Sequence, residues 1–416
     1  EIAAVREVLE NVRTNKDAAL REYTERFDKV SLKSFEVSAE DLKAAALKMQ
    51  NENPELYKSL CYSRDLALKF ARKQRESFDD FEVELEKGLF TGQKNIPVER
   101  AGVYVPAGRF PLVSTVVMTV TPAVAAGVKE IYLCTPPREH PVNKGEPYAD
   151  TNIMAAAYIC GVTKVFAAGG AQAVAALAFG TESIPRVDVI AGPGNKFVAE
   201  AKRLVYGNVG IDMVAGPTEV FIIADSTANP VWLAADLLAQ AEHDVVAQPV
   251  LALTDRSLAQ KVSDEIERQL ETLSTKETAR ASIDNYGKII ITKTLEEAAD
   301  LANRKAPEHL ELAMEAGKER DRIQALCRNF GSLFIGHGAA EVFGDYAAGL
   351  NHTLPTSGSA RFTGGLSVRV FLKTVTTLRT KDGKKGTVMS AQAAGCLGDA
   401  EGLAAHARAA RLRLEK

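Results

Sequence analysis

The segment LLAQAEHDVVAQP, residues 237–249, carries side chains that could bind a metal ion. An alanine-rich stretch runs here into polar residues, among them Gln240 and His243. Residues three apart on a helix share one face, with Cβ atoms about 5–6 Å apart, so a helix would aim both side chains in one direction. Imidazole is a common ligand of Zn²⁺, although an amide ligand is unusual. The same face could equally be a hydrogen-bonded surface or a core contact.

Three further polar segments could contribute to the same chemistry. They are RKAPEHLELAM with Glu308 and His309, VFGDYAAGLNHTLPTSGSARFTGGLS with Asp345 and His352, and EGLAAHARAARL with Glu401 and His406. Each also has a structural interpretation: a carboxylate after a proline can begin a helix, a glycine-rich segment can be a plain loop, and a C-terminal histidine can cap a helix. Histidines, an aspartate and an amide together form a set suited to Zn²⁺, but their spacing alone does not bring them together.

The stretch AGPGNKFVAEAKR, residues 191–203, comes nearest to a dinucleotide-binding fingerprint. That fingerprint is GxGxxG after a strand; here Gly192 and Gly194 are present, and Phe197 occupies the last glycine position. A glycine turn that enters a helix can still bind phosphate through backbone N–H groups and the helix dipole. A tight strand-to-helix turn without a ligand explains the glycines equally well.

Short apolar runs that end at Gly, Pro or Asp predict the strands that must position these residues. They are GVYVPAG, KEIYLCTPP, KVFAAGG, VDVIAGPG and EVFIIAD between residues 102 and 225, and PVLALTD, KIIITK and FGSLFIG between 249 and 336. Alanine-rich helical stretches lie between them, an alternation typical of βαβ units and a helix-covered parallel sheet. The first 75 residues show helical apolar spacing. We predict an α/β fold with two Rossmann-like parallel-sheet domains, a helical N-terminal segment, and a helical C-terminal tail from about residue 368.

Composition excludes several classes of protein. A chain of 416 residues exceeds the roughly 250–300 residues of a single core, which indicates at least two domains. A net charge of −3 argues against nucleic-acid binding. The stretch 112–128 is interrupted by Ser, Thr and Pro, so it predicts protein interior rather than a membrane span. Five scattered cysteines fit a reducing, cytoplasmic compartment, and the start at Glu1 rather than Met is compatible with a removed organellar targeting peptide.

Eight motifs in one order resemble the histidinol dehydrogenase family. They are YVPAG, GGAQAVAA, AGPGNKFV, AGPTEV, LLAQAEHD, APEHLEL, GDYAAGLNHTLPTSGSARF and EGLAAHA, between about residues 100 and 406. GDYxxGxNHxLPT together with PEHLE is the most specific part of the match. The helical first hundred residues are compatible with the family but less diagnostic.

The resemblance implies a reaction, a metal and an assembly. The family oxidises a primary alcohol through a bound aldehyde to the carboxylate with two NAD⁺ in succession. Its default substrate is L-histidinol and its product L-histidine, the last step of histidine biosynthesis. One Zn²⁺ per subunit would be bound by Gln240, His243, Asp345 and His406. Because the tail histidine comes from the partner subunit in the family, the resemblance implies an intertwined homodimer with shared active sites.

The resemblance also implies roles for individual residues. His309, with a reference pKa of about 6.5, is suited to accept the alcohol proton, and Glu308 to activate the water that hydrates the aldehyde. Positions that contact NAD in the family correspond to Tyr104, Gln172 and Asn195. Substrate-pocket positions correspond to Thr218, His352 and Glu401, together with His309 and the four zinc ligands.

The apolar runs and the resemblance together predict four segments of the chain. They are residues 1–25, an N-terminal helical segment; 26–103 with 220–367, a Rossmann-like domain with the zinc and catalytic residues; 104–219, a second Rossmann-like domain that binds NAD; and 368–416, a tail exchanged with the partner subunit.

Some residues depart from the histidine-producing members of the family. In place of a Tyr-Pro-Ser-Ser-like stretch after YVP, this chain has GRFPLVST with Arg109, and the serine of AGPSE is Thr218. These features, with RFTGGLSVRVFLKT, resemble paralogues, one group of which oxidises 2,3-dihydroxypropane-1-sulfonate to sulfolactate. Arg109 would suit an anionic substrate because its planar guanidinium pairs with oxyanions; it would equally suit the NAD pyrophosphate or the surface. Both substrates therefore stay open at this point.

Two functions of another class are also compatible with parts of the sequence. A zinc- and NAD-binding protein without catalysis is disfavoured by the adjacent Glu308 and His309. A metal-dependent hydrolase would act without NAD⁺ and would leave the turn at Gly192 and Gly194 unexplained.

Overall fold

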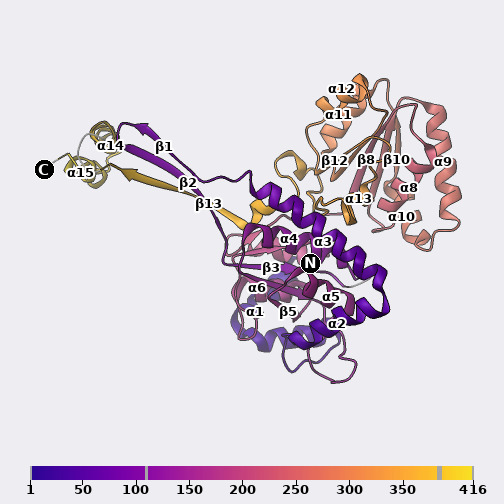
Figure 1. Cartoon of the computed structure of the whole chain (residues 1–416), viewed down its shortest axis with the longest axis horizontal. Coiled ribbons are helices and arrows are strands. Elements are labelled where there is room, and N and C mark those ends of the chain that lie inside the picture. The colour runs from indigo at the N-terminus through magenta and orange to yellow at the C-terminus, as the bar shows by residue number, and fades with distance from the viewer. Residues whose placement is uncertain (1, 108–110, 382–386, 415–416) are drawn as a thin grey trace. The chain divides into compact units, whose positions relative to one another are not determined.

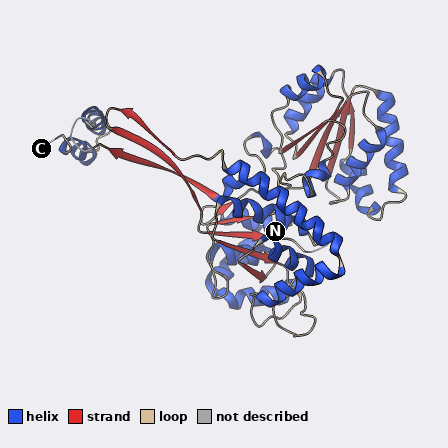
Figure 2. Ribbon diagram, in the orientation of Figure 1, coloured by secondary structure: helices blue, strands red, loops and turns tan. Residues whose placement is uncertain are grey.

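The computed structural model describes residues 2–107, 111–381 and 387–414. The chain divides into two compact units: Glu1–Lys73 with Val98–Phe371, termed the first unit, and Gln74–Pro97 with Leu372–Lys416, termed the second unit. The first unit holds two five-stranded parallel sheets, and the second holds a three-stranded antiparallel sheet (Figures 1 and 2). The α/β fold with two parallel sheets is confirmed. The predicted residue ranges of the domains stay predictions.

The N-terminal segment is helical, as its apolar spacing predicts. Helix α1 (Ile2–Tyr23) buries one apolar face and continues into the π-helical turn η1 (Thr24–Asp28). The next residue, Lys29, takes a left-handed backbone conformation with φ 61°. Helices α2 (Ala39–Glu52) and α3 (Pro54–Arg75) follow.

The first parallel sheet has the strand order β5-β4-β3-β6-β7. Its strands are β3 (Arg100–Tyr104), β4 (Glu130–Thr135), β5 (Lys164–Ala167), β6 (Val189–Ala191) and β7 (Gly210–Ile211). The intervening helices are α4 (Val113–Ala126), α5 (Thr151–Cys160), α6 (Gly170–Phe179) and α7 (Lys196–Val205). Helix α4 is largely buried, so the stretch 112–128 is protein interior as predicted. The strand order reverses between β3 and β6, and sheets of this kind bind ligands beyond the carboxyl ends of the strands at that point.

The second parallel sheet repeats this topology with the order β10-β9-β8-β11-β12. Its strands are β8 (Glu219–Ala224), β9 (Gln248–Leu253), β10 (Lys288–Ile291), β11 (His309–Ala313) and β12 (Ser332–Ile335). Alternate residues of β8 face opposite sides: Val220 and Ile222 pack with helices α8 (Pro230–Ala241), α9 (Arg256–Leu270) and α10 (Lys276–Tyr286). Phe221 and Ile223 pack with α11 (Leu295–Lys305) and α12 (Lys318–Leu326). Both faces are covered, which explains the continuously apolar strands.

The second unit was only partly predicted. Its helices α14 (Val388–Ala400) and α15 (Ala404–Leu412) agree with a helical tail. Its antiparallel strands β1 (Phe81–Glu86), β2 (Leu89–Pro97) and β13 (Leu372–Thr380) were not expected from the sequence. Large apolar side chains of this unit are exposed, among them Phe81, Leu85, Leu378, Met389 and Leu397. So small a sheet and helix pair cannot bury a core of its own.

The sequence predicts no membrane span and a reducing, cytoplasmic compartment. Within the described ranges, no helix combines the length and the apolar character needed to cross a membrane. All five cysteines are free thiols, and Cys134, Cys160 and Cys327 are buried. The cytoplasmic location stays a prediction.

Candidate active site

The amino ends of β8 and β11, neighbours in the second sheet, bring three predicted site residues together. Thr218 immediately precedes β8, Glu308 precedes β11, and His309 is the first residue of β11, where it pairs in register with Val220. A helix beginning after Pro307, one interpretation of the sequence, is therefore wrong. The strand HLELA escaped notice because Glu311 interrupts its apolar run; that side chain is buried and accepts a hydrogen bond from the Glu341 N–H at 3.0 Å.

Glu308 is a buried carboxyl held by two donors. Thr218 Oγ1 donates to Glu308 Oε2 at 2.6 Å, and the Glu219 N–H donates to the same oxygen at 3.0 Å. Burial raises the pKa of Glu308 to about 7, against the lowering effects of His309 and of these two hydrogen bonds. A carboxyl with this pKa can exchange a proton near neutral pH.

His309 is buried among carboxylates. Its Nδ1 lies 3.2 Å from the carbonyl oxygen of Glu219 and 3.8 Å from carboxylate oxygens of both Glu308 and Glu341. Its Nε2 faces Asp345 Oδ1 at 3.6 Å, and no hydrogen bond to Nε2 comes from the part of the chain that the structure describes. Burial lowers the pKa of His309, but the surrounding carboxylates outweigh it and raise the pKa to about 10.

Gln240 and His243 do not share a helical face, which corrects the prediction. Helix α8 ends at Ala241, so Gln240 lies in its last turn and His243 in the turn beyond it. Gln240 is buried, and with its amide nitrogen toward Glu341 it donates to both carboxylate oxygens, at 3.1 and 3.2 Å. His243 is exposed at the wall of a large cavity.

Asp345 lies on the short helix α13 (Glu341–Tyr346), and three histidines from other parts of the chain surround it. Burial favours its protonated form, but His309, His352 and His243 outweigh burial and lower the pKa of Asp345. His352 Nε2 lies 3.2 Å from the Ser114 hydroxyl, and burial lowers the pKa of this imidazole. Asp345 is therefore an anion at neutral pH and the strongest potential cation ligand of the group.

A cavity of about 1400 Å³ in the first unit is lined by two of the predicted zinc ligands and by the three predicted NAD contacts. Its wall includes Tyr104, Gln172 and Asn195 as well as His243 and Asp345. The first three lie at or beyond the carboxyl ends of β3, β5 and β6, where such sheets bind ligands. The first sheet thus faces the cavity with its carboxyl edge, whereas Thr218, Glu308 and His309 lie at the amino edge of the second.

The glycine turn between β6 and α7 is tightly clamped. Gly192 has φ +118°, and a Cβ there would lie 2.2 Å from the Tyr104 carbonyl oxygen, so only glycine allows this approach to β3. The Gly192 N–H donates to Asp212 at 2.7 Å, and Lys202 donates to the Gly192 carbonyl at 2.8 Å. Lys202 and Asp212 also form a buried ion pair with each other. Asn195 caps α7: its side-chain oxygen accepts hydrogen bonds from the N–H groups of Phe197 and Val198 in the first turn of the helix.

Glu219 is a site residue that the sequence analysis missed. Its side chain accepts from the Ser357 N–H at 2.5 Å and forms an ion pair with Lys305, while its backbone contacts Glu308 and His309. Lys305 also donates to Gln248 Oε1 at 2.7 Å. The sequence did contain a signal for this residue, because an acidic side chain at the start of the apolar run EVFIIA is unusual in a buried strand.

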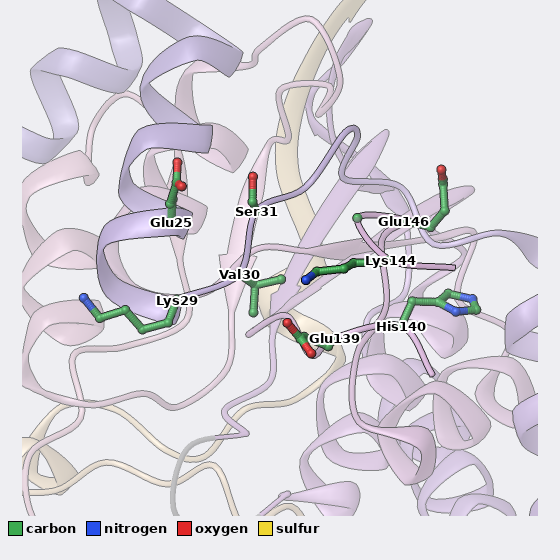
Figure 3. A pocket seen from close by; sticks show the side chains of 9 residues that line it. Glu25, Lys29, Val30, Ser31, Glu139, His140, Lys144 and Glu146 are labelled. Carbon is green, nitrogen blue, oxygen red and sulfur yellow. The ribbon is translucent and has the colours of Figure 1, made fainter. Parts of the chain in front are cut away.

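A second, smaller cavity of about 350 Å³ contains none of the predicted site residues (Figure 3). Charges of both signs line it, from Glu25, Lys29, Glu139 and Lys144. His140 Nδ1 accepts from the N–H groups of Val142 and Asn143 at 3.1 and 2.9 Å, so this imidazole stabilises its own loop.

The remaining predicted residues lie elsewhere. His406 is on α15 and Glu401 is the C-cap of α14; both are exposed and belong to the second unit. Arg109 lies outside the described residues. Over residues 2–107, 111–381 and 387–414, no group of three or more His, Cys, Asp or Glu side chains could hold a metal ion.

Two parallel sheets of one topology, with a buried Glu–His pair and a tightly held glycine turn, define a protein of the Rossmann-like α/β class; its function has to be argued from the site and its relatives. The chain belongs to the histidinol dehydrogenase family, a family of oxidoreductases, because the family model named histidinol dehydrogenase matches residues 2–414. Histidinol dehydrogenase of Streptococcus mutans is 45% identical over 420 residues, covering 100% of this chain and 93% of that protein. The Geobacillus kaustophilus enzyme is 46% identical, covering 99% and 94%. The crystal structure of histidinol dehydrogenase from Elizabethkingia anophelis aligns with a TM-score of 0.91 at 37% identity, covering 99% of this chain and 92% of that one.

Proposed function

We propose that this chain oxidises L-histidinol through the aldehyde to L-histidine in two NAD-dependent steps. The observation that carries the proposal is the buried Glu308–His309 pair, whose His309 Nε2 faces Asp345 in the unit that also holds the glycine turn. The similar proteins named above are histidinol dehydrogenases, which favours histidinol over 2,3-dihydroxypropane-1-sulfonate as the substrate.

Each hydride transfer requires that a proton leave the reacting oxygen. A proton on His309 Nδ1 can be donated to the Glu219 carbonyl, which leaves Nε2 as the accepting nitrogen of the neutral imidazole. Glu308, with a pKa of about 7, is suited to take a proton from the water that adds to the aldehyde. The two side chains then have separate roles in the two oxidations.

The residues present fit a zinc ion in their chemistry. Asp345 is anionic and acts electrostatically with His243, and an imidazole, a carboxylate and an amide oxygen form a donor set that Zn²⁺ accepts. We propose Gln240, His243 and Asp345 as ligands from the first unit, with His406 as the fourth. When bound, the ion would orient the polar atoms of the substrate and withdraw charge from them.

The residues around the glycine turn fit a dinucleotide. The N-terminus of α7 follows the turn at Gly192, and the helix dipole there favours the negative charge of a phosphate. Tyr104, Gln172 and Asn195 line the adjacent cavity, and we propose them as NAD contacts.

The assembly we propose is a homodimer with shared active sites. All six residues of β1 are exposed, and apolar side chains of β13, α14 and α15 are exposed as well. Exposed apolar surface of this extent marks an interaction site, and a second copy of the chain would supply the missing cover. His406 would then reach the site of the partner.

The experiment that tests the proposal is steady-state NADH production by zinc-loaded protein with L-histidinol and, separately, with 2,3-dihydroxypropane-1-sulfonate. We expect two NADH per histidinol, and none from the His309→Asn variant. Turnover of the sulfonate but not of histidinol would contradict histidinol as the substrate and would leave the proposed NAD-dependent oxidation in place. No NADH from either, with hydrolysis in the absence of NAD⁺, would overturn the dehydrogenase.

A further inference from the structure

Asp28, the last residue of η1, lies at the wall of the large cavity beside the proposed NAD contacts. Gln172 Nε2 donates to Asp28 Oδ2 at 3.3 Å. Gly170 makes this possible: it has φ +63°, and a Cβ there would lie 2.6 Å from Gln172 Oε1. The glycine therefore leaves room for the amide to turn toward the carboxylate.

Asp28 also lies next to the segment that follows β4. A Cβ on Gly169 would be 3.2 Å from Asp28 Oδ1 and 3.0 Å from Pro136, so this glycine is flanked by both residues. Strand β4 is the second strand of the first sheet in chain order. In NAD-binding sheets of this topology, a carboxylate near the end of the second strand accepts hydrogen bonds from the adenosine ribose.

The segment after β4 carries no such carboxylate at its start. It reads Pro136, Pro137 and Arg138, and an arginine here is typical of enzymes that accept the 2′-phosphate of NADP. In this chain, however, the Arg138 guanidinium donates to the Ala107 carbonyl at 2.5 Å. The carboxylate comes instead from a distant part of the sequence.

We propose that Asp28 accepts hydrogen bonds from the adenosine ribose hydroxyls of the dinucleotide and thereby selects NAD⁺ over NADP⁺. The proposal rests on the proposed NAD-dependent function and adds to it a specificity-determining residue. An ionised carboxylate has about four acceptor positions, and within the described residues one hydrogen bond, from Gln172, reaches Asp28. The remaining positions suit a diol, whose two hydroxyls both donate.

The charge of Asp28 explains the exclusion of a 2′-phosphate. Burial raises the pKa of Asp28 to about 6, although Gln172 and Arg138 act in the opposite direction, so the group is ionised above neutral pH. A phosphate in the same place would put two like charges in contact in a partly desolvated site, which weakens the binding of NADP⁺ relative to NAD⁺.

The test measures binding rather than turnover. Dissociation constants of NAD⁺, NADP⁺, ADP-ribose and 2′-phospho-ADP-ribose are determined by calorimetry on the full-length, metal-free protein and its variants. Wild type should bind NAD⁺ about a hundredfold more tightly than NADP⁺. Asp28→Asn should reduce this ratio about tenfold or more, and the two ADP-ribose ligands should follow the same pattern. Asp28→Glu, which keeps the charge, should retain the preference.

Glu139→Gln is the matched control, because Glu139 is an exposed carboxylate next to Arg138 and should leave the ratio unchanged. Asp28→Ser is a second variant for the event that Asp28→Asn does not fold. If a folded Asp28 variant binds NAD⁺ and keeps the wild-type ratio of the NAD⁺ and NADP⁺ dissociation constants, the role of Asp28 is overturned, while the proposed NAD dependence is not. Failure of wild type to bind NAD⁺ or ADP-ribose would overturn the proposed NAD dependence as well.

Discussion

His309 Nδ1 lies 3.2 Å from the carbonyl oxygen of Glu219, and the N–H of the same Glu219 lies 3.0 Å from Glu308 Oε2. A carbonyl oxygen only accepts, so Nδ1 must carry the proton of this contact and Nε2 is left to face Asp345. One backbone position at the start of β8 therefore orients both members of the Glu–His pair. The buried Glu219 side chain, paired with Lys305, fixes that position in turn.

Glu308→Gln should separate the two oxidations. The amide keeps the size of the side chain but cannot accept a proton from water, so we expect kcat for oxidation of the aldehyde to fall about 10²–10⁴-fold. The interconversion of alcohol and aldehyde should change much less, because His309 remains. NADH formation from histidinol and from histidinal, measured separately, checks this. Equal losses in both steps would contradict a role of Glu308 in water activation alone.

The rate should rise with pH in two stages. Glu308 and His309 both act as bases, so protonation of either lowers activity. Burial raises the pKa of Glu308 to about 7, and the facing carboxylates overcome burial to raise the pKa of His309 to about 10. Activity should therefore rise about a hundredfold per pH unit below pH 7, where both groups are protonated, and about tenfold per pH unit between pH 7 and 10, where only His309 still is. A kcat profile from pH 6 to 10 checks this; in Glu308→Gln the stage near pH 7 should disappear, and a constant kcat between pH 6 and 8 in wild type would contradict the assignment.

Asp212→Asn should destabilise the protein and weaken NAD⁺ binding. It leaves the buried Lys202 ammonium without its ion pair, at a cost of about 3–5 kcal/mol, and loosens the Gly192 turn. The double variant Lys202→Met/Asp212→Asn should recover part of the stability, because no buried charge is left unpaired. Urea unfolding and the Kd of NAD⁺ measure the two effects. Glu200→Gln breaks an exposed pair with Arg203 on the same helix and should change neither; full stability of Asp212→Asn would rule out the clamp.

The parallel sheets could be predicted because strands covered on both faces are continuous apolar runs. Strand β11 could not be predicted in this way, because Glu311 interrupts its apolar run and is buried through contacts that form only in the folded chain. The strands of the second unit could not be predicted because they lack a buried apolar face. Strand β1, for example, is exposed along its whole length. In the site, the motifs indicated Glu308, His309 and Asp345, whereas Asp28 comes from a turn more than a hundred positions away from Gln172. No spacing rule connects those two residues.

Removal of zinc should abolish turnover and leave most of the fold intact. The two sheets are held by apolar clusters that contain none of the proposed ligands, so their stability does not depend on a metal. Exhaustive chelation followed by activity and circular dichroism checks this, with zinc returned as the control. Full activity of the metal-free protein would contradict the proposed role of Asp345 and its neighbours as ligands.

Mixed dimers should show whether the tail of one subunit serves the site of the other. His406→Ala and His243→Ala should each lose zinc affinity and activity, because each removes one proposed ligand. If His406 acts in the partner's site, a dimer of one variant with the other contains one site with both histidines intact and one with neither. Subunits exchanged by mild denaturation and refolding should then regain up to about a quarter of wild-type activity, since half of the dimers are mixed and each has one intact site. A matched mixture of His243→Ala with Asp345→Asn, which both alter the first unit, should stay inactive. No recovery in the His406→Ala mixture despite proven exchange would assign His406 to the site of its own chain. Recovery in the control would instead show that His243 and Asp345 do not serve one site from the same chain.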